Sequence, residues 1–130
     1  MGAAADMRTV VKEVTIFHSG EVLKINQNID CCTESVLYLI TCTKQACRKQ
    51  YLRETGRAAY KRYTEHEDSC KDSSTTKVVG LHFQLPGHSP ANLEMVPIEK
   101  VWGGRAARKA RERALIRGHQ MVRYGINTQS

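Results

Sequence analysis

Two tyrosines and two cysteines lie on either side of one polar loop. Tyr38 lies in the apolar run SVLYLIT and Tyr51 in RKQYLR, and Cys42 and Cys47 close the loop between the runs. β-Branched and aromatic residues around a polar turn predict a β-hairpin. With a loop of residues 43–46, Cys42 lies opposite Cys47 and Tyr38 opposite Tyr51, so all four share one face. On spacing alone, the simpler interpretation is that the two tyrosines fill a sheet face, as most tyrosines on strands do.

A basic helical segment follows the second tyrosine. From Thr55–Gly56 to about Asp68, the spacing of Ala59, Tyr63 and His66 predicts a helix with one buried face. Arg62 lies one turn before His66. If this helix folds back over the hairpin, it brings a guanidinium and an imidazole beside the two phenols, which are groups that bind phosphate and handle protons.

The remaining elements predict an α+β fold, with a small central three-stranded antiparallel sheet flanked by helices and an N-terminal β-hairpin. A chain of 130 residues favours one compact domain. The Tyr38–Tyr51 hairpin should form the centre of the sheet, and Pro97 places the third strand at an edge, because proline cannot donate to a ladder. The other segments are VTIFHSGEVLKI as the N-terminal hairpin, VVGLHFQLPGHSPAN as a short turn or helix, LEMVPIEKV as the third strand, and Arg105 to about Gly118 as a helix.

The charge of the chain indicates its partner class. The net charge is +7 and the pI about 9.3, and the excess lies in RKQYLRETGRAAYKR and GGRAARKARERALIRGH. Clustered Lys and Arg bind polyanions by releasing counterions, which makes nucleic acid the leading partner class. Solvated surface helices, or helices that bind acidic protein surfaces, remain alternatives. A membrane partner is disfavoured, because the second run offers mostly alanine to lipid.

The sequence predicts an intracellular protein, and we expect it in the nucleus. The apolar run Val36–Ile40 is too short to span a bilayer, and the N-terminus MGAAADMRTV lacks the apolar core of a signal peptide. Five cysteines without such a signal do not favour a disulfide framework. Burial is the expected state of the three cysteines outside the hairpin, namely Cys31, Cys32 and Cys70.

Two cysteines and two histidines have the spacing of a zinc site. Cys42 and Cys47 are close in sequence, as are His82 and His88 in HFQLPGH, and both gaps suit zinc ligands. A structural Zn²⁺ would tether the hairpin tip to the later turn and stabilise a small domain. The alternatives are a disulfide between the cysteines, and histidines that pack or contact substrate.

Several blocks of the chain resemble the GIY-YIG nuclease superfamily. The blocks are VLYLITC, KQYLRETGR and KRYTEH, and HFQLPGHS, IEK, RERALIR and YGIN resemble especially the version found in Penelope-like retroelements and related animal sequences. The resemblance covers roughly residues 35–127. It implies a three-stranded antiparallel sheet flanked by helices and hydrolysis of DNA phosphodiesters with a divalent metal. It also implies a division into an N-terminal extension, residues 1–30, and a nuclease domain, residues 31–130.

The resemblance assigns roles residue by residue. VLY and YLR occupy the two tripeptide positions, which makes Tyr38 and Tyr51 the motif tyrosines, and a phenol with a pKa lowered by nearby cations would accept a proton from water. Arg62 would stabilise the transition state, beside His66. The remaining assignments are Glu112 in RERALI as the ligand of Mg²⁺ or Mn²⁺, and Asn127 near the end of the domain.

Arg53 is the main departure from the motif, because it replaces the glycine that ends the second tripeptide. A long cationic side chain here is expected to crowd the site. The expected function is therefore a metal-dependent DNA endonuclease, with a catalytically inactive nucleic-acid-binding module as the alternative. Glu99 is a rival carboxylate, ranked below Glu112. Apart from the resemblance, Glu112 would be read as a helix-surface residue paired with Arg108.

Overall fold

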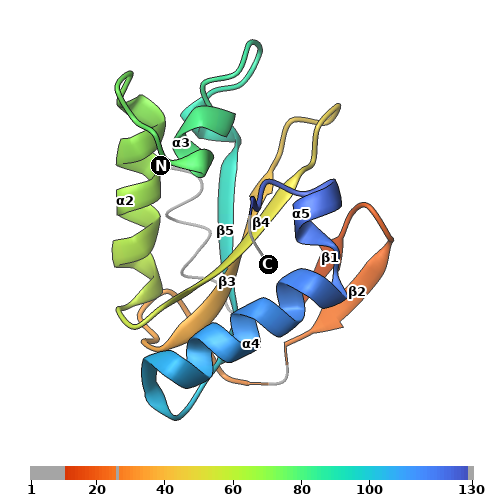
Figure 1. The fold of residues 1–130 in the computed structure, drawn as a ribbon, viewed down its shortest axis with the longest axis vertical. Helices are drawn as coiled ribbons and strands as arrows, with labels where there is room; N and C mark the ends of the chain where they lie inside the picture. Colours follow the sequence, from red (N-terminus) through yellow and green to blue (C-terminus); the bar gives the residue numbers. More distant parts are fainter. Residues whose placement is uncertain (1–10, 26, 129–130) are drawn as a thin grey trace.

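A three-stranded antiparallel sheet in the order β4-β3-β5 forms the centre of the fold (Figure 1). The computed structural model describes residues 11–25 and 27–128. The expected α+β architecture is confirmed, including the N-terminal hairpin and the flanking helices. The elements are β1 Glu13–Ile16, β2 Glu21–Lys24, β3 Val36–Cys42, β4 Gln50–Thr55, α2 Ala59–Lys71, α3 Val78–His82, a 3-10 turn Pro90–Asn92, β5 Leu93–Lys100, α4 Gly104–Gly118 and α5 Met121–Tyr124.

Strand β3 is buried along its whole length because both faces of the sheet are covered. Side chains alternate between the faces of a strand. Tyr38 and Ile40 therefore join one apolar cluster, with α2 and α3, while Leu37 and Leu39 join another, with the N-terminal hairpin and Ile116 of α4. The continuous apolar run of β3 follows from this double burial.

The predicted hairpin register is wrong by two residues. Tyr38 lies opposite Arg53, and Tyr51 lies opposite Ile40. The Cys42 amide donates to the Lys49 carbonyl at 2.9 Å, so the loop is longer than predicted. Because side chains repeat every two residues along a strand, a shift of two keeps the tyrosines on their predicted face.

The loop is longer because it contains a compact turn of its own. The amides of Cys47 and Arg48 both donate to the Lys44 carbonyl, and Arg48 adopts a positive φ of 53°. The sequence has no glycine at this position to indicate a left-handed residue. The sequence therefore does not reveal this turn, which sets the register of the hairpin.

Only one of the two strands of the Tyr38–Tyr51 hairpin lies at the centre of the sheet, whereas the sequence predicted a central position for the whole hairpin. β3 is the middle strand, but β4 is an edge strand, because β5 pairs with the other side of β3. The expected edge position of the strand that contains Pro97 is confirmed. Pro97 faces Tyr38, next to a register shift between Leu37 and Tyr38, so its missing N–H falls where the ladder is already irregular.

The N-terminal hairpin packs on the sheet face opposite the tyrosines. Ile16, Ile25 and Ile29 are buried in the same cluster as Leu37 and Leu39. The hairpin is therefore part of the core that supports β3. The division at residue 30 stays a prediction.

The segment before β3 caps helix α2. The amides of Ala59 and Tyr60 donate to the carbonyls of Thr33 and Cys31, which satisfies N–H groups that the first helical turn leaves free. The expected burial of cysteines holds for Cys70 but is wrong for Cys32, which is exposed, and Cys31 is half-buried. Backbone hydrogen bonds to α2 hold the Cys31–Thr33 segment in position, and burial of its two thiols does not.

Candidate active site and metal cluster

A cleft of about 380 Å³ lies between α2, β4 and the end of the described chain. Its wall combines a phenol, an imidazole and several charged groups, as expected for a site that binds a phosphate. Four of the residues assigned from the sequence line it, together with others that were not. The lining residues with charged, phenol, imidazole or amide side chains are Tyr51, Arg53, Arg62, Glu65, His66, Lys77 and Asn127.

Tyr38 lies beneath this cleft and is fully buried. Its hydroxyl lies 2.7 Å from Nε2 of His66 and accepts a hydrogen bond from Nε of Arg62 at 3.3 Å. Burial raises the pKa of the Tyr38 phenol above its ordinary value, although Arg62 acts in the opposite direction. Tyr38 therefore holds the two helical side chains in place and does not face the cleft.

Tyr51 is the phenol that lines the cleft. Its ring makes an edge contact with His66, and the guanidinium of Arg53 lies 5.9 Å from its centroid. Burial raises the pKa of Tyr51, and this outweighs the lowering by Arg53 and Arg62. The expectation of a tyrosine made acidic by its cationic neighbours is wrong, because removal from water dominates. At neutral pH the Tyr51 hydroxyl is a hydrogen-bond donor.

His66 remains neutral at physiological pH. Burial, with Arg62 next in weight, lowers its pKa to about 3. A neutral imidazole beside the Tyr38 hydroxyl needs no counter-ion in the core. The apolar stripe of α2, predicted from the spacing of its residues, is what brings His66 inward.

Arg62 is fixed from two sides. Nη1 donates to Glu65 at 3.0 Å, and Nε donates to Tyr38. Burial alone would lower the pKa of Arg62, but Tyr38 and Glu65 raise it above the ordinary value. Glu65 also pairs with Arg57, an exposed residue before α2. The result is a permanently charged guanidinium in the wall of the cleft, held in one orientation.

Glu112 is buried on α4 and does not pair with Arg108. Its Oε2 accepts the Glu54 amide at 2.8 Å and lies 3.3 Å from Nε of Arg53, while Oε1 lies 3.6 Å from Nζ of Lys109. Arg108 binds Glu54 and Ser35 instead. The alternative reading of Glu112 as an exposed helix residue is therefore wrong, since it lies against the edge strand.

Glu112 and Asn127 both bind backbone groups of β4, at the edge that does not pair with β3. Glu112 accepts the amide of Glu54, and the Asn127 side chain both accepts the Leu52 amide at 2.8 Å and donates to the Leu52 carbonyl at 3.0 Å. These are alternate residues, whose backbone groups point away from β3. The two side chains thus satisfy an edge that would otherwise be open to another strand.

Glu112 has the chemistry of a ligand for a hard divalent cation, namely a buried carboxylate held in place by a backbone amide. It is not among the residues that line the cleft, whereas Arg53 is. The cationic groups of Arg53 and Lys109 approach its two oxygens. The rival Glu99 pairs with Arg111 on α4 at 2.7 Å, away from the cleft lining. The donor chemistry at Glu112 fits a metal, and Arg53 competes for the same carboxylate.

The predicted zinc ligands converge on one point. Cys42, Cys47, His82 and His88 each offer a ligand atom, and these atoms lie within 4.8 Å of one another. Cys47 Sγ lies 3.5 Å from His82 Nε2, and the two imidazole rings are 4.9 Å apart. Two thiols and two imidazoles at this separation match the donor set of structural Zn²⁺.

The hydrogen bonding of His88 supports a metal-binding tautomer. Its Nδ1 lies 3.2 Å from the Pro86 carbonyl, which can only accept, so Nδ1 carries the proton. Its Nε2 is buried and, within residues 11–25 and 27–128, has no hydrogen-bond partner. A histidine that ligates a metal typically binds a carbonyl through its other nitrogen in this way. The cluster fits Zn²⁺ on geometry and on this orphaned nitrogen.

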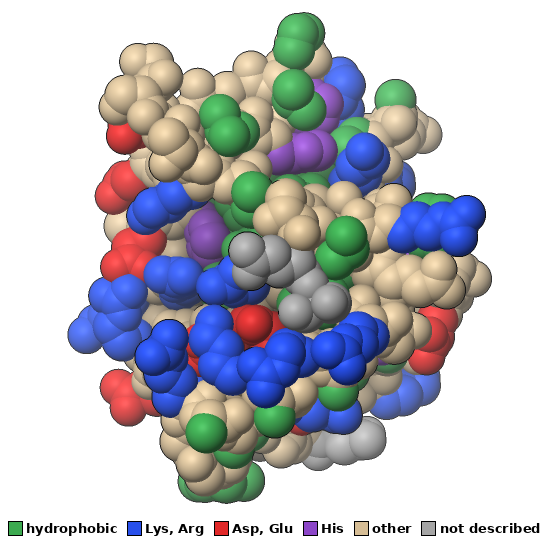
Figure 2. Space-filling view, in the orientation of Figure 1, with side chains coloured by type: hydrophobic (Ala, Val, Ile, Leu, Met, Phe, Trp, Pro, Cys, Tyr) green, Lys and Arg blue, Asp and Glu red, His purple; other side chains and the backbone are tan. Residues whose placement is uncertain are grey.

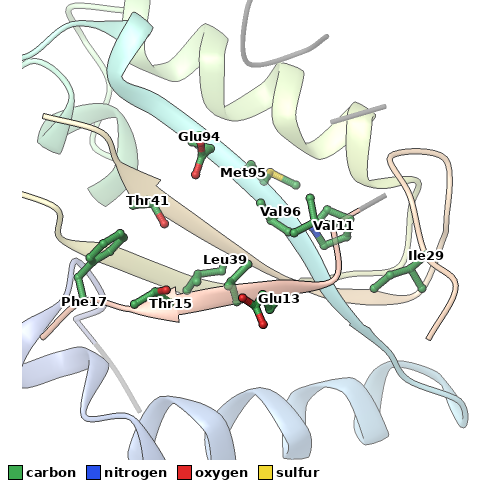
Figure 3. Close-up of a pocket in the computed structure, with 12 residues that line it drawn as sticks. Val11, Glu13, Thr15, Phe17, Ile29, Leu39, Thr41, Glu94, Met95 and Val96 are labelled. Carbon is green, nitrogen blue, oxygen red and sulfur yellow. The ribbon is translucent and has the colours of Figure 1, made fainter. Parts of the chain in front are cut away.

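A second hollow, of about 300 Å³, lies between β1 and the sheet (Figure 3). Its lining is mainly apolar, with Val11, Ile29, Leu39 and Val96 around it, and Glu13 and Glu94 are among the lining residues. None of the residues assigned to chemistry lines this hollow. The cleft beside α2 is therefore the candidate active site.

Basic side chains gather on the same side of the molecule as α4. Figure 2 shows Lys and Arg in a row across this face. Four arginines of α4 are exposed, namely Arg105, Arg111, Arg113 and Arg117. A row of cationic side chains of this kind attracts polyanions.

Two charged side chains that pair with residues of the candidate site were missed from the sequence. Glu65 lies three residues after Arg62, and Lys109 three residues before Glu112, which is the spacing of helical ion pairs. That spacing was available as a signal in both cases. No such signal was available for the hydrogen bond from the Glu54 amide to Glu112, because it joins a strand to a helix distant in the sequence.

Comparisons with known proteins add no relative, since no family model, curated protein or solved structure matches the chain. Among the described residues, no helix is both long and apolar enough to cross a membrane.

Proposed function

We propose that this protein is a metal-dependent DNA endonuclease of the GIY-YIG type, and that it acts on nucleic acid inside the cell, in the nucleus. The observation that supports it is the convergence of Tyr51, Arg62 and His66 on one cleft, with Glu112 behind Arg53. These residues come from a strand and two helices far apart in sequence. Their types and placement suit phosphodiester hydrolysis.

Each residue contributes a definite interaction to this proposal. Arg62, oriented by Tyr38 and Glu65, stabilises the charge that develops on the phosphate. The Tyr51 hydroxyl donates to a phosphate oxygen or to the attacking water, and neutral His66 keeps Tyr38 and Arg62 aligned. Glu112 would hold Mg²⁺ or Mn²⁺, which supplies charge neutralisation and a more acidic bound water.

The cysteine and histidine cluster has a separate, structural task in this proposal. Zn²⁺ bound by Cys42, Cys47, His82 and His88 would join the β3–β4 loop to the segment after α3. α3 packs on α2, the helix that carries Arg62 and His66. The metal would thereby stabilise the wall of the cleft without taking part in hydrolysis.

A second function is favoured by one specific contact. Arg53 lies between Glu112 and the cleft and pairs with the carboxylate. If this pair persists in the DNA complex, the chain is a nucleic-acid-binding module that does not cleave. The basic face over α4 would bind the phosphate backbone in either case, so it does not distinguish the two functions.

Glu112→Gln tests the endonuclease most directly. Gln retains an oxygen that can accept the Glu54 amide, so the edge of β4 stays capped, but the charge that binds a cation is lost. Nicking of supercoiled plasmid with Mg²⁺ or Mn²⁺ should stop, while DNA affinity stays within about twofold. Wild type that nicks equally well in chelator, or Glu112→Gln with full activity, would overturn the proposal.

Arg62→Ala provides a second, linked test. It should lower the nicking rate by roughly 100- to 1000-fold, as loss of one charge-stabilising donor does in other enzymes. Combined with Glu112→Gln, it should cost little more, because members of one catalytic unit are not additive. Strictly additive effects of the two changes would indicate two independent surface charges.

A further inference from the structure

Arg53 and Glu112 form a pair that is close but weakly held. Nε of Arg53 lies 3.3 Å from Oε2 of Glu112, and the Arg53 side chain is 33% exposed against 7% for Glu112. Yet this Nε is buried without a hydrogen bond of acceptable geometry to any described residue. The contact is therefore mainly charge attraction, which a competing ion can replace at modest cost.

Both oxygens of Glu112 face a cationic group. Lys109 Nζ lies 3.6 Å from Oε1, and it also pairs with Glu54 at 3.2 Å. Arg53 has no comparable second carboxylate among the ion pairs of the described chain. Arg53 can therefore move away from Glu112 without breaking another ion pair, whereas movement of Lys109 would break its contacts with both Glu54 and Glu112.

Arg53 also faces the cleft, where it shares the wall with Arg62 and Tyr51. Glu112 does not line the cleft, so a phosphate that enters it would meet Arg53 and not the carboxylate. Arginine binds phosphate through two parallel N–H groups, a contact that fixes the direction of the guanidinium, whereas its contact with Glu112 has no such hydrogen bond. Binding of substrate therefore weakens the hold of Arg53 on Glu112.

We propose that Arg53 is a built-in counter-ion that competes with the divalent metal for Glu112, and that a phosphodiester in the cleft relieves this competition by drawing Arg53 away. The inference rests on the proposed function, since it concerns the loading of the same site. It makes metal affinity low in the free protein and higher in the DNA complex. The two ligands are then linked, each raising the affinity for the other.

The test measures Mn²⁺ affinity directly, by isothermal titration calorimetry of zinc-loaded protein. Arg53→Gln should bind Mn²⁺ about 10-fold more tightly than wild type, since a charged partner of Glu112 is removed. Arg113→Gln is the matched control, because it removes one exposed arginine next to Glu112 in the sequence. It should change the affinity less than about twofold.

Arg53→Gly is the second variant, in case Gln packs poorly against Tyr51. Thermal unfolding of both variants establishes that they fold, and some loss of stability is expected because each removes the ion-pair partner of buried Glu112 and the contact with Tyr51. In both variants, addition of Glu112→Gln should abolish the gain in Mn²⁺ affinity. A gain that survives Glu112→Gln would show that Mn²⁺ binds elsewhere and overturn the inference.

The DNA arm uses a short duplex at saturating concentration, with the Glu112→Gln complex as the baseline for Mn²⁺ bound to DNA itself. Duplex should raise the Mn²⁺ affinity of wild type about 10-fold and that of Arg53→Gln much less. Equal effects in both proteins would show that Arg53 does not link the two ligands.

Failure of this inference is distinguishable from failure of the proposed function. If Arg53→Gln gains Mn²⁺ affinity through Glu112 but no variant nicks plasmid, the competition stands and the endonuclease does not. If wild type nicks plasmid in Mn²⁺ and Arg53→Gln binds Mn²⁺ no better than Arg113→Gln, the endonuclease stands and the competition is refuted.

Discussion

The Tyr38 hydroxyl and Nε2 of His66 lie 2.7 Å apart in the buried space between β3 and α2. Neither group is exposed enough to act freely on a solvent molecule, since Tyr38 is fully buried and His66 nearly so. The contact joins the central strand to the helix that carries Arg62. We interpret it as the support that fixes the cleft wall.

Tyr38→Phe should therefore destabilise the fold as well as weaken the site. It leaves the His66 nitrogen and Arg62 Nε without their hydroxyl partner, and an unpaired buried polar group costs about 1–3 kcal/mol. Urea unfolding measures this loss. Tyr60→Phe is the matched control, because Tyr60 is 46% exposed on the same helix and should change stability by less than about 0.5 kcal/mol. Equal stability of Tyr38→Phe and wild type would refute the supporting role.

The sequence predicted the architecture well because its strongest patterns are local. The run around Tyr38 and the stripe of Ala59, Tyr63 and His66 follow from burial on a strand and on a helix. The edge position of the strand that contains Pro97 follows from the missing N–H of proline. Even the wrong hairpin register preserved the face of the tyrosines, since the error was two residues. What failed was the loop length, which depends on the positive φ of Arg48.

The candidate site was predicted as a set of residues but not as an arrangement. Glu112 and Asn127 reach the edge of β4 by tertiary packing, and no spacing in the sequence reveals that they bind its backbone. The two tyrosines look alike in sequence, yet only Tyr51 lines the cleft. Arg53 was predicted to crowd the site, whereas the structure pairs it with Glu112.

His66 should make the fold sensitive to acid. Its ordinary pKa is 6.5 and its folded pKa about 3, so between these values the unfolded chain binds more protons than the folded one. The free energy of unfolding from His66 therefore falls as pH drops from about 6.5 toward 3, by at most about 1.4 kcal/mol per pH unit.

His66→Gln isolates this contribution, because Gln can still bond to Tyr38 but does not titrate. Denaturant unfolding at pH 7 and pH 5, in protein treated with chelator so that zinc loss does not interfere, measures the difference. Wild type should lose more stability than His66→Gln over this interval. Identical pH profiles would show that His66 is not held neutral in the folded state.

Affinity for duplex DNA should be micromolar or weaker, without sequence preference, and should fall steeply with salt. If about four phosphates are contacted, the affinity drops on the order of 100-fold between about 50 and 200 mM salt. Arg113→Gln and Arg117→Gln, on the exposed face of α4, should each reduce the slope of log affinity against log salt by about one.

Lys24→Gln is the control for this measurement, because Lys24 lies on the N-terminal hairpin and pairs with Glu13. Its slope should match that of wild type. A flat salt response, or no DNA affinity, would favour the alternative in which the basic helices bind an acidic protein surface. Fluorescence anisotropy over a salt series supplies all of these values.

Zinc should copurify with the protein at up to one ion per chain and should stabilise it. Cys42 and Cys47 would supply thiolates and His88 a nitrogen that is otherwise orphaned, so we expect the folded state to bind zinc and the unfolded chain to bind it poorly. At free zinc about 100 times its dissociation constant, the gain is about 2.7 kcal/mol, or roughly 10 °C in Tm. Elemental analysis and thermal unfolding with and without chelator measure the two effects.

Cys42→Ser combined with Cys47→Ser should lose the zinc, the chelator response and the extra stability together. Cys70→Ser is the matched control, because Cys70 is also buried in the same apolar cluster but lies outside the metal-binding group. It should lower Tm through packing alone and keep both the zinc and the chelator response. Co²⁺ substitution adds a test of geometry, since a site of two thiolates and two imidazoles gives the absorption bands of tetrahedral cobalt. Freshly purified, reduced wild type that holds no zinc and does not respond to chelator would show that the four side chains only pack together.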